Sequence, residues 1–127
     1  MPRLRQLITV TALTALAAGH ASAQDKVCLL EGNFKIGNMP LIISDCAENR
    51  TMPKETFREA CAGMSEFTLA GETYKARVTF SSACPPAPQG TCEGLFGGAM
   101  NASYYKRDAQ TLADTRRSCL AQQGRWK

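Results

Sequence analysis

Residues 26–46, KVCLLEGNFKIGNMPLIISDC, contain the clearest indication of the fold, a β-hairpin. Two β-prone runs, residues 27–30 and 41–43, flank the Gly37-Asn38 dipeptide, which is typical of two-residue hairpin turns. Pro40 has no N–H to donate, so we expect the second strand to begin after it or to lie at an edge there. The stretch therefore predicts an antiparallel sheet.

A helix is predicted after this hairpin, over residues 53–65. Proline suits a first helical turn, where its missing N–H has no intrahelical partner. Apolar side chains at spacings of three and four residues define one buried face. They are Phe57, Ala60, Cys61 and Met64. We expect this face to pack on the sheet.

Three further strands are expected in the second half of the chain. Residues 73–80 alternate between apolar and polar side chains, which is typical of a half-buried strand. Residues 91–96 and 99–106 flank Gly97-Gly98, a second candidate for a hairpin turn. With a final helix, the order of elements is ββα followed by βββα. It predicts an α+β fold in which two helices pack on a small antiparallel sheet of four to five strands.

The final helix is predicted over residues 109–123. Asp108 is a good N-cap, and Gly124 suits the left-handed residue that follows many helices. Its expected buried side consists of Leu112, Cys119 and Leu120.

Both predicted helices share a short pattern of two residues. Arg58 precedes Cys61 by three positions, and Arg116 precedes Cys119 by three. A duplicated unit would leave such a pattern, although two matching positions also arise by chance.

The first 23 residues have the three parts of a cleavable secretory signal. Two arginines are followed by an apolar run over residues 7–18 and by small residues up to Ala23. The run is shorter than the roughly 20 residues that a membrane-spanning helix needs, which disfavours an uncleaved anchor. We expect cleavage after Ala23, a single domain over residues 24–127 without an integral membrane segment, and a periplasmic or secreted location.

All six cysteines lie in the predicted mature domain. An even number in a short exported chain predicts three disulfides, each of which adds about 2–4 kcal/mol of stability. We predict the pairs Cys84–Cys92, Cys46–Cys61 and Cys28–Cys119. The first pair follows from the short proline-rich loop between its members, and the last would tie the two ends of the domain together.

The residue types present exclude several kinds of catalysis. The only histidine is His20, within the predicted signal, so a Ser-His-Asp triad or a Cys-His dyad made by the mature chain alone is excluded. The cysteine spacing excludes a four-cysteine zinc site and a Cys-x-x-Cys redox motif, and the chain has no P-loop. We therefore predict that the protein is not an enzyme and has no cofactor. Candidate acids for the alternative, carboxylate-dependent hydrolysis, are Glu31, Asp45, Glu48 and Glu93.

Aromatic and basic residues near the C-terminus form the candidate interaction surface, because such side chains dominate protein-binding hot spots. They are Tyr104, Tyr105, Lys106, Arg107, Arg116, Arg117, Arg125 and Trp126. Residues 67–127 are net basic, but the mature chain carries only +2, which is too little to predict nucleic acid as a partner. The alternative is that the tyrosines and Trp126 only pack the sheet against the last helix.

Three functions are compatible with this sequence. The first is a small exported binding module without catalytic activity, an inhibitor of or accessory to another exported protein, because a disulfide-stapled domain loses little freedom on association. The second is a secreted effector or toxin that acts on a membrane or a competitor. The third is the small carboxylate-dependent hydrolase.

Overall fold

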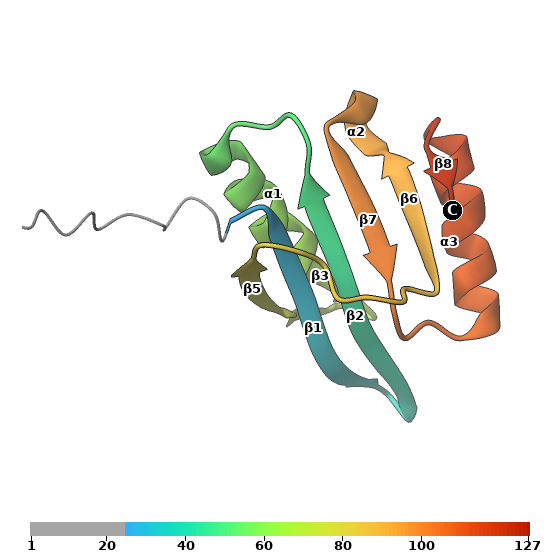
Figure 1. The fold of residues 1–127 in the computed structure, drawn as a ribbon. Helices are drawn as coiled ribbons and strands as arrows, with labels where there is room; N and C mark the ends of the chain where they lie inside the picture. The colour runs from blue at the N-terminus through green and yellow to red at the C-terminus, as the bar shows by residue number, and fades with distance from the viewer. Residues whose placement is uncertain (1–24) are drawn as a thin grey trace, which may run out of the picture.

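The computed structural model describes residues 25–127, which fold around a six-stranded antiparallel sheet with the strand order β5-β1-β2-β7-β6-β8 (Figure 1). The elements are β1 (Val27–Ile36), β2 (Met39–Asn49), α1 (Lys54–Ser65), β3 (Glu66–Leu69), β4 (Glu72–Lys75), β5 (Arg77–Ser81), β6 (Gly90–Gly94), α2 (Leu95–Gly98), β7 (Met100–Tyr104), α3 (Ala109–Ala121) and β8 (Arg125–Trp126). The α+β class with three disulfides is confirmed. The predicted signal, residues 1–23, lies outside the described residues.

The predicted hairpin is present as β1 and β2, with Gly37 at a positive φ of 64° in the turn. Pro40 lies within β2, opposite Lys35. The other neighbour of β2, strand β7, pairs only with residues 45–49. One side of β2 is therefore an open edge at Pro40, as proline in a strand requires.

Helix α1 follows the predicted pattern. It begins directly after Pro53, and Phe57 and Cys61 are fully buried against the sheet, with Met64 partly buried beside them. The core lies between one face of the sheet and the helices, where Phe57, Met100 and the helix-bound cysteines meet.

The predicted strand 73–80 is two strands in the structure. Strand β4 pairs with β3 in a separate two-stranded hairpin, whereas β5 pairs with β1 at the edge of the main sheet. Ala76, buried at the break between them, donates its backbone N–H to the Ser65 carbonyl at 2.8 Å. Alternation continues through the break, so it did not reveal that the two halves belong to different sheets. The main sheet also gains β8, whose two residues are too few for a periodic signal.

Helix α3 is capped as predicted at its start, where the Asp108 carboxylate accepts the Thr111 backbone N–H at 2.8 Å. Its end differs, because Gln123 and not Gly124 takes the positive φ. Glycine is required at position 124 for a different reason, because a Cβ there would lie only 2.6 Å from the Cys92 Sγ. Leu120, which was expected to be buried, is 52 % exposed.

The three disulfides are Cys28–Cys61, Cys46–Cys84 and Cys92–Cys119, so all three predicted pairs are wrong. The pairs Cys84–Cys92 and Cys46–Cys61 fail because side chains alternate between the two faces of a sheet. Cys28 and Cys92 point to the face that carries the helices, whereas Cys46 points to the opposite face. The predicted pair Cys28–Cys119 fails because strands β2 and β7 separate β1 from β6, to which α3 is bonded.

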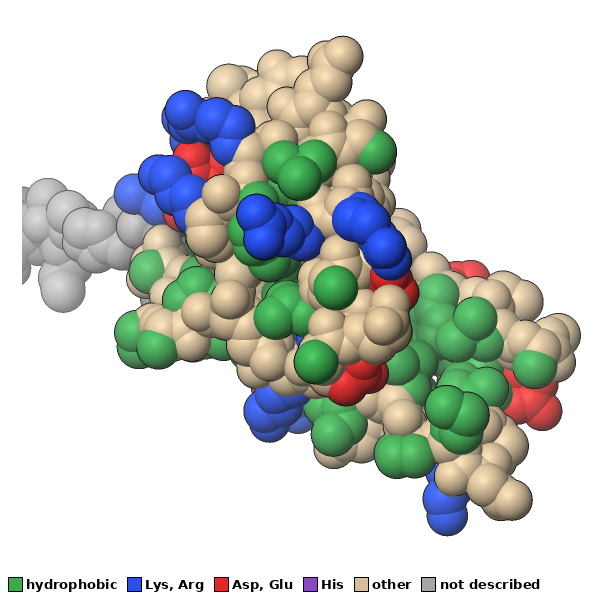
Figure 2. All heavy atoms as spheres, turned by 90° about the vertical axis from the view of Figure 1, so that its right-hand side faces the viewer, with side chains coloured by type: hydrophobic (Ala, Val, Ile, Leu, Met, Phe, Trp, Pro, Cys, Tyr) green, Lys and Arg blue, Asp and Glu red, His purple; other side chains and the backbone are tan. Residues whose placement is uncertain are grey.

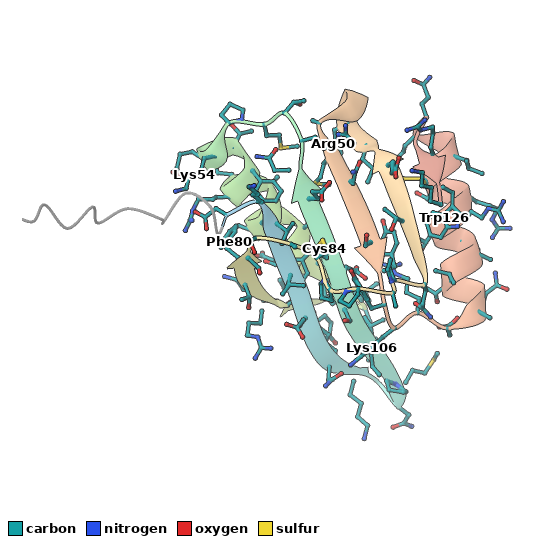
Figure 3. The ribbon with its side chains drawn as sticks, viewed as in Figure 1. Arg50, Lys54, Phe80, Cys84, Lys106 and Trp126 are labelled. Atoms are coloured by element: carbon teal, nitrogen blue, oxygen red, sulfur yellow. A yellow bond between two sulfur atoms is a disulfide. The ribbon has the colours of Figure 1, made fainter. Side chains whose placement is uncertain are left out.

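The face opposite the helices is crossed by the proline-rich segment between β5 and β6 (Figure 1). The Cys46–Cys84 bond ties this segment to β2, and Cys84 lies over the middle of the sheet (Figure 3). The Tyr105 hydroxyl adds a hydrogen bond to the Pro85 carbonyl at 2.7 Å. The crossing therefore connects the two halves of the domain.

Those halves are related by an approximate two-fold axis between β2 and β7. Each half is a ββαβ unit, ignoring the β3–β4 hairpin and α2, and its last strand pairs with its first. The row of paired residues across the six strands is Phe80, Cys28, Ala47, Ala102, Cys92 and Trp126. This row has the same residue classes read from either end, and each cysteine in it is bonded to its own helix. The repeated pattern of arginine and cysteine in the two helices thus matches a repeated architecture.

Candidate functional site

A hollow of about 550 Å³ lies on the side of α3 that faces away from α1; we call it the outer hollow. It is lined by Ala109, Leu112, Ala113, Arg116, Arg117, Leu120 and Trp126. Basic and hydrophobic side chains lie close together on the surface that includes α3 (Figure 2). The hollow thus combines an apolar floor with cationic side chains.

Trp126 is held rigidly at the edge of this hollow. Strand β8 places it opposite Cys92, and Lys127 exchanges two backbone hydrogen bonds of 2.9 Å with Thr91. The Tyr104 ring stacks on Trp126 with 5.9 Å between the ring centroids. Gly90 leaves the space that the indole fills, since a Cβ at that position would collide with it. The indole is therefore preorganised before any partner arrives.

The two arginines of the outer hollow differ in their pairing. Arg117 forms an ion pair with Asp114 in the preceding turn of α3. Arg116 is exposed and makes no ion pair with any residue of the described chain. Its guanidinium is therefore available to an anionic group in solution.

A second recess, the interhelical groove, lies on the helix-bearing face between α1 and α3. Cavities of about 470, 350 and 230 Å³ meet there, and all three are lined by Arg107. The Arg107 guanidinium donates to the Asp45 carboxylate and to the Thr115 hydroxyl, both at 2.8 Å, and lies 4.4 Å from the centroid of the Tyr104 ring. These contacts connect β2, β7 and α3. Arg107 therefore holds these three elements together inside the groove.

Burial raises the pKa of Asp45 above its usual range, although the adjacent Arg107 opposes the shift. The folded state therefore holds a proton on Asp45 more tightly than the unfolded state does. The stabilisation linked to that proton is full at low pH and is lost as pH rises through the raised pKa.

This linkage predicts the pH dependence of an Asp45→Asn variant, which cannot ionise at that position. We expect the stability of the wild type relative to the variant to fall as pH rises from the usual aspartate pKa, about 3.9, toward neutrality. Urea unfolding of both proteins across this interval measures the difference. A difference that grows with pH would mean that attraction to Arg107 outweighs burial.

The eight residues of the predicted interaction surface do not share one surface. Arg116, Arg117 and Trp126 line the outer hollow. Tyr104, Lys106 and Arg107 line the interhelical groove, and Lys106 lies beside the lower half of β2 (Figure 3). Tyr105 and Arg125 lie on the opposite face of the sheet, where Arg125 forms an ion pair with Glu93 at 3.1 Å.

Tyr104 has a packing role, because its ring stacks on Trp126 and lies under the Arg107 guanidinium. Sequence reasoning missed that Leu112 and Leu120 line the outer hollow. Their spacing from Arg116, four residues on either side, places all three on one stripe of α3 and was the available signal.

The four candidate acids each have a partner. Asp45 pairs with Arg107 in the groove, while the other three lie on the opposite face. There Glu31 pairs with Arg77, and Glu48 accepts a hydrogen bond from Asn101. A hydrogen bond from Lys127 lowers the pKa of Glu93, with Arg125 adding to the effect. Three of the acids therefore share the face opposite the helices, but each of the four is already engaged by a basic or amide side chain.

Among residues 25–127, no three side chains of His, Cys, Asp or Glu come close enough together to hold a metal ion. No helix in that part of the chain has the length and apolarity to cross a membrane. No protein-family model, curated protein or solved structure matches this chain. The geometry of the described residues is thus the basis for inferring function.

Proposed function

We propose that this chain is a small exported binding module without catalytic activity, which uses the outer hollow to attach to another periplasmic or extracellular protein. Three disulfides are consistent with an oxidising compartment. The composition of residues 1–23 supports export through a signal that is cleaved after Ala23. The role is that of an inhibitor or accessory of the partner.

The observation that carries the proposal is the set of bonds and contacts that hold the outer hollow in place. Its helix is bonded to β6 through Cys92–Cys119, and its indole is fixed by Tyr104 and by the short strand β8. A surface that is already ordered loses little conformational freedom on binding, so more of the contact energy appears as affinity.

The composition of the hollow supports the same conclusion. Tryptophan and arginine are the residues most enriched in binding hot spots, and Leu120 adds an exposed apolar side chain beside them. In contrast, the candidate acids are occupied in ion pairs or hydrogen bonds on two different faces, which favours binding over carboxylate-dependent hydrolysis.

Charge reversal tests the proposal. Residues 24–127 are immobilised and exposed to the periplasmic and secreted proteins of the source cells, and retained proteins are quantified by mass spectrometry. We expect the Arg116→Glu/Arg117→Glu variant to retain at least tenfold less of the specific partner, a loss of about 1.4 kcal/mol in binding free energy. Both side chains are exposed, so the fold should be unaffected.

The matched control is Lys35→Glu/Arg50→Glu. It makes the same change in net charge at two exposed residues outside the outer hollow, and neither forms an ion pair within residues 25–127. It should retain the partner as the wild type does. Equal retention by both double variants would show that the outer hollow is not the binding surface.

A further inference from the structure

The approximate two-fold axis places a counterpart of the outer hollow at the other end of the sheet. This first-half hollow, about 430 Å³, lies between α1 and β5 and is lined by Arg58 and Phe80 among others. Phe80 is paired with Cys28 as Trp126 is paired with Cys92. Arg58 and Arg116 each precede the helix cysteine by three residues. Phe80 and Trp126 lie at opposite ends of the sheet (Figure 3).

Arg58, which lines the first-half hollow, already has a carboxylate partner within the chain. Asp25, just before β1, accepts from Arg58 and from Lys54, with both nitrogen–oxygen distances at 3.1 Å. The Arg58 guanidinium also lies 4.5 Å from the centroid of the Phe80 ring. The Asp25 side chain is only 14 % exposed. An arginine that contacts both a carboxylate and an aromatic ring is thus an arrangement that this architecture already contains once.

The outer hollow lacks that carboxylate. The residue three positions before Cys92, equivalent to Asp25 before Cys28, is Gln89, whose amide is engaged with the backbone of Arg107. The counterpart of Lys54, four residues before the helix arginine, is Leu112, which makes the outer hollow more apolar. Arg116 therefore has the position of Arg58 without its acidic partner.

We propose that the outer hollow binds an aspartate or glutamate side chain flanked by apolar residues, within a segment of the partner protein. This inference rests on the proposed function and specifies its ligand chemistry. The carboxylate pairs with Arg116 as Asp25 pairs with Arg58, and the apolar neighbours contact Leu112, Leu120 and Trp126. The basic balance of residues 67–127 favours the approach of such a segment.

Trp126 is the only tryptophan of the chain, so its fluorescence reports directly on the hollow. The probes are two synthetic peptides, acetyl-Leu-Asp-Leu-Asp-Leu-amide and its counterpart with asparagine in place of aspartate. We expect the acidic peptide to change the Trp126 emission and to bind at least tenfold more tightly than the neutral one. Arg116→Gln should remove this preference, whereas Arg58→Gln should leave it within about twofold.

Equal affinities for the two peptides would overturn the proposal, as would an unchanged preference in Arg116→Gln or no response to either peptide at about 1 mM. Failure of this inference is separable from failure of the proposed function. If the Arg116/Arg117 charge reversal abolishes partner retention but both peptides bind equally, the binding module stands and the carboxylate chemistry is wrong. If the peptides behave as expected while retention is unaffected, the site stands and the proposed function is wrong.

Discussion

Replacing Cys28 and Cys61 together with alanine should lower the free energy of unfolding by about 4–5 kcal/mol. The bond closes a segment with a sequence separation of 33, and the loss of that constraint alone costs about 3–4 kcal/mol. Both cysteines are also fully buried beneath α1, so the variant loses packing in the core. Urea unfolding followed by circular dichroism measures the change.

Cys46→Ala/Cys84→Ala provides the matched comparison. Its sequence separation of 38 is similar, but the bond lies on the face opposite the helices, where Cys46 is fully buried and Cys84 is partly exposed. We expect a smaller loss, about 3–4 kcal/mol, because the constraint is removed without opening the core between sheet and helices. If this pair costs as much as the first, the position of Cys28 and Cys61 in the core between sheet and helices adds nothing to their covalent constraint.

Phe57→Ala should destabilise the domain by about 3–5 kcal/mol. Phe57 is fully buried in the core between α1 and the sheet. Its truncation leaves a cavity that the surrounding backbone cannot move far enough to fill. The two disulfides that hold the helices to the sheet limit such relaxation. The change is measured as the shift of the urea unfolding curve with all disulfides intact.

Phe96→Ala is the control for this second substitution. Phe96 lies in α2 and is 62 % exposed, so removal of its ring should change stability by no more than about 0.5 kcal/mol. A large loss at Phe96, or a negligible one at Phe57, would contradict the placement of the core between α1 and the sheet.

Local patterns predicted those elements whose signal lies within a few neighbouring residues. The Gly37-Asn38 turn determined the first hairpin, the apolar stripe around Phe57 determined α1, and Asp108 determined the start of α3. Strands β3 and β8 were missed because they have four and two residues, too few for periodicity to be visible. Both exist because partner strands are near in space.

The disulfide pairs depend partly on the register of the first hairpin and partly on the packing of distant segments. A two-residue turn at Gly37-Asn38 places Cys28 opposite Ala47, so Cys46 must point to the other face of the sheet. Cys28 and Cys46 therefore cannot share one face, although the turn does not assign their partners. Their partners, Cys61 and Cys84, depend on which face the helix covers and which face the proline-rich segment crosses.

The sequence by itself determined the α+β class, the six half-cystines, the first helix and the residue types available for binding, because each depends on composition or on contacts close along the chain. Only the tertiary structure decided which cysteines pair, that the two halves repeat one unit, and that Arg116 and Trp126 line one hollow while Tyr105 and Arg125 face the other way. The physical reason is that these features depend on strand order and on the face to which each side chain points. Both arise when distant segments pair, and neither is encoded in the spacing of neighbouring residues.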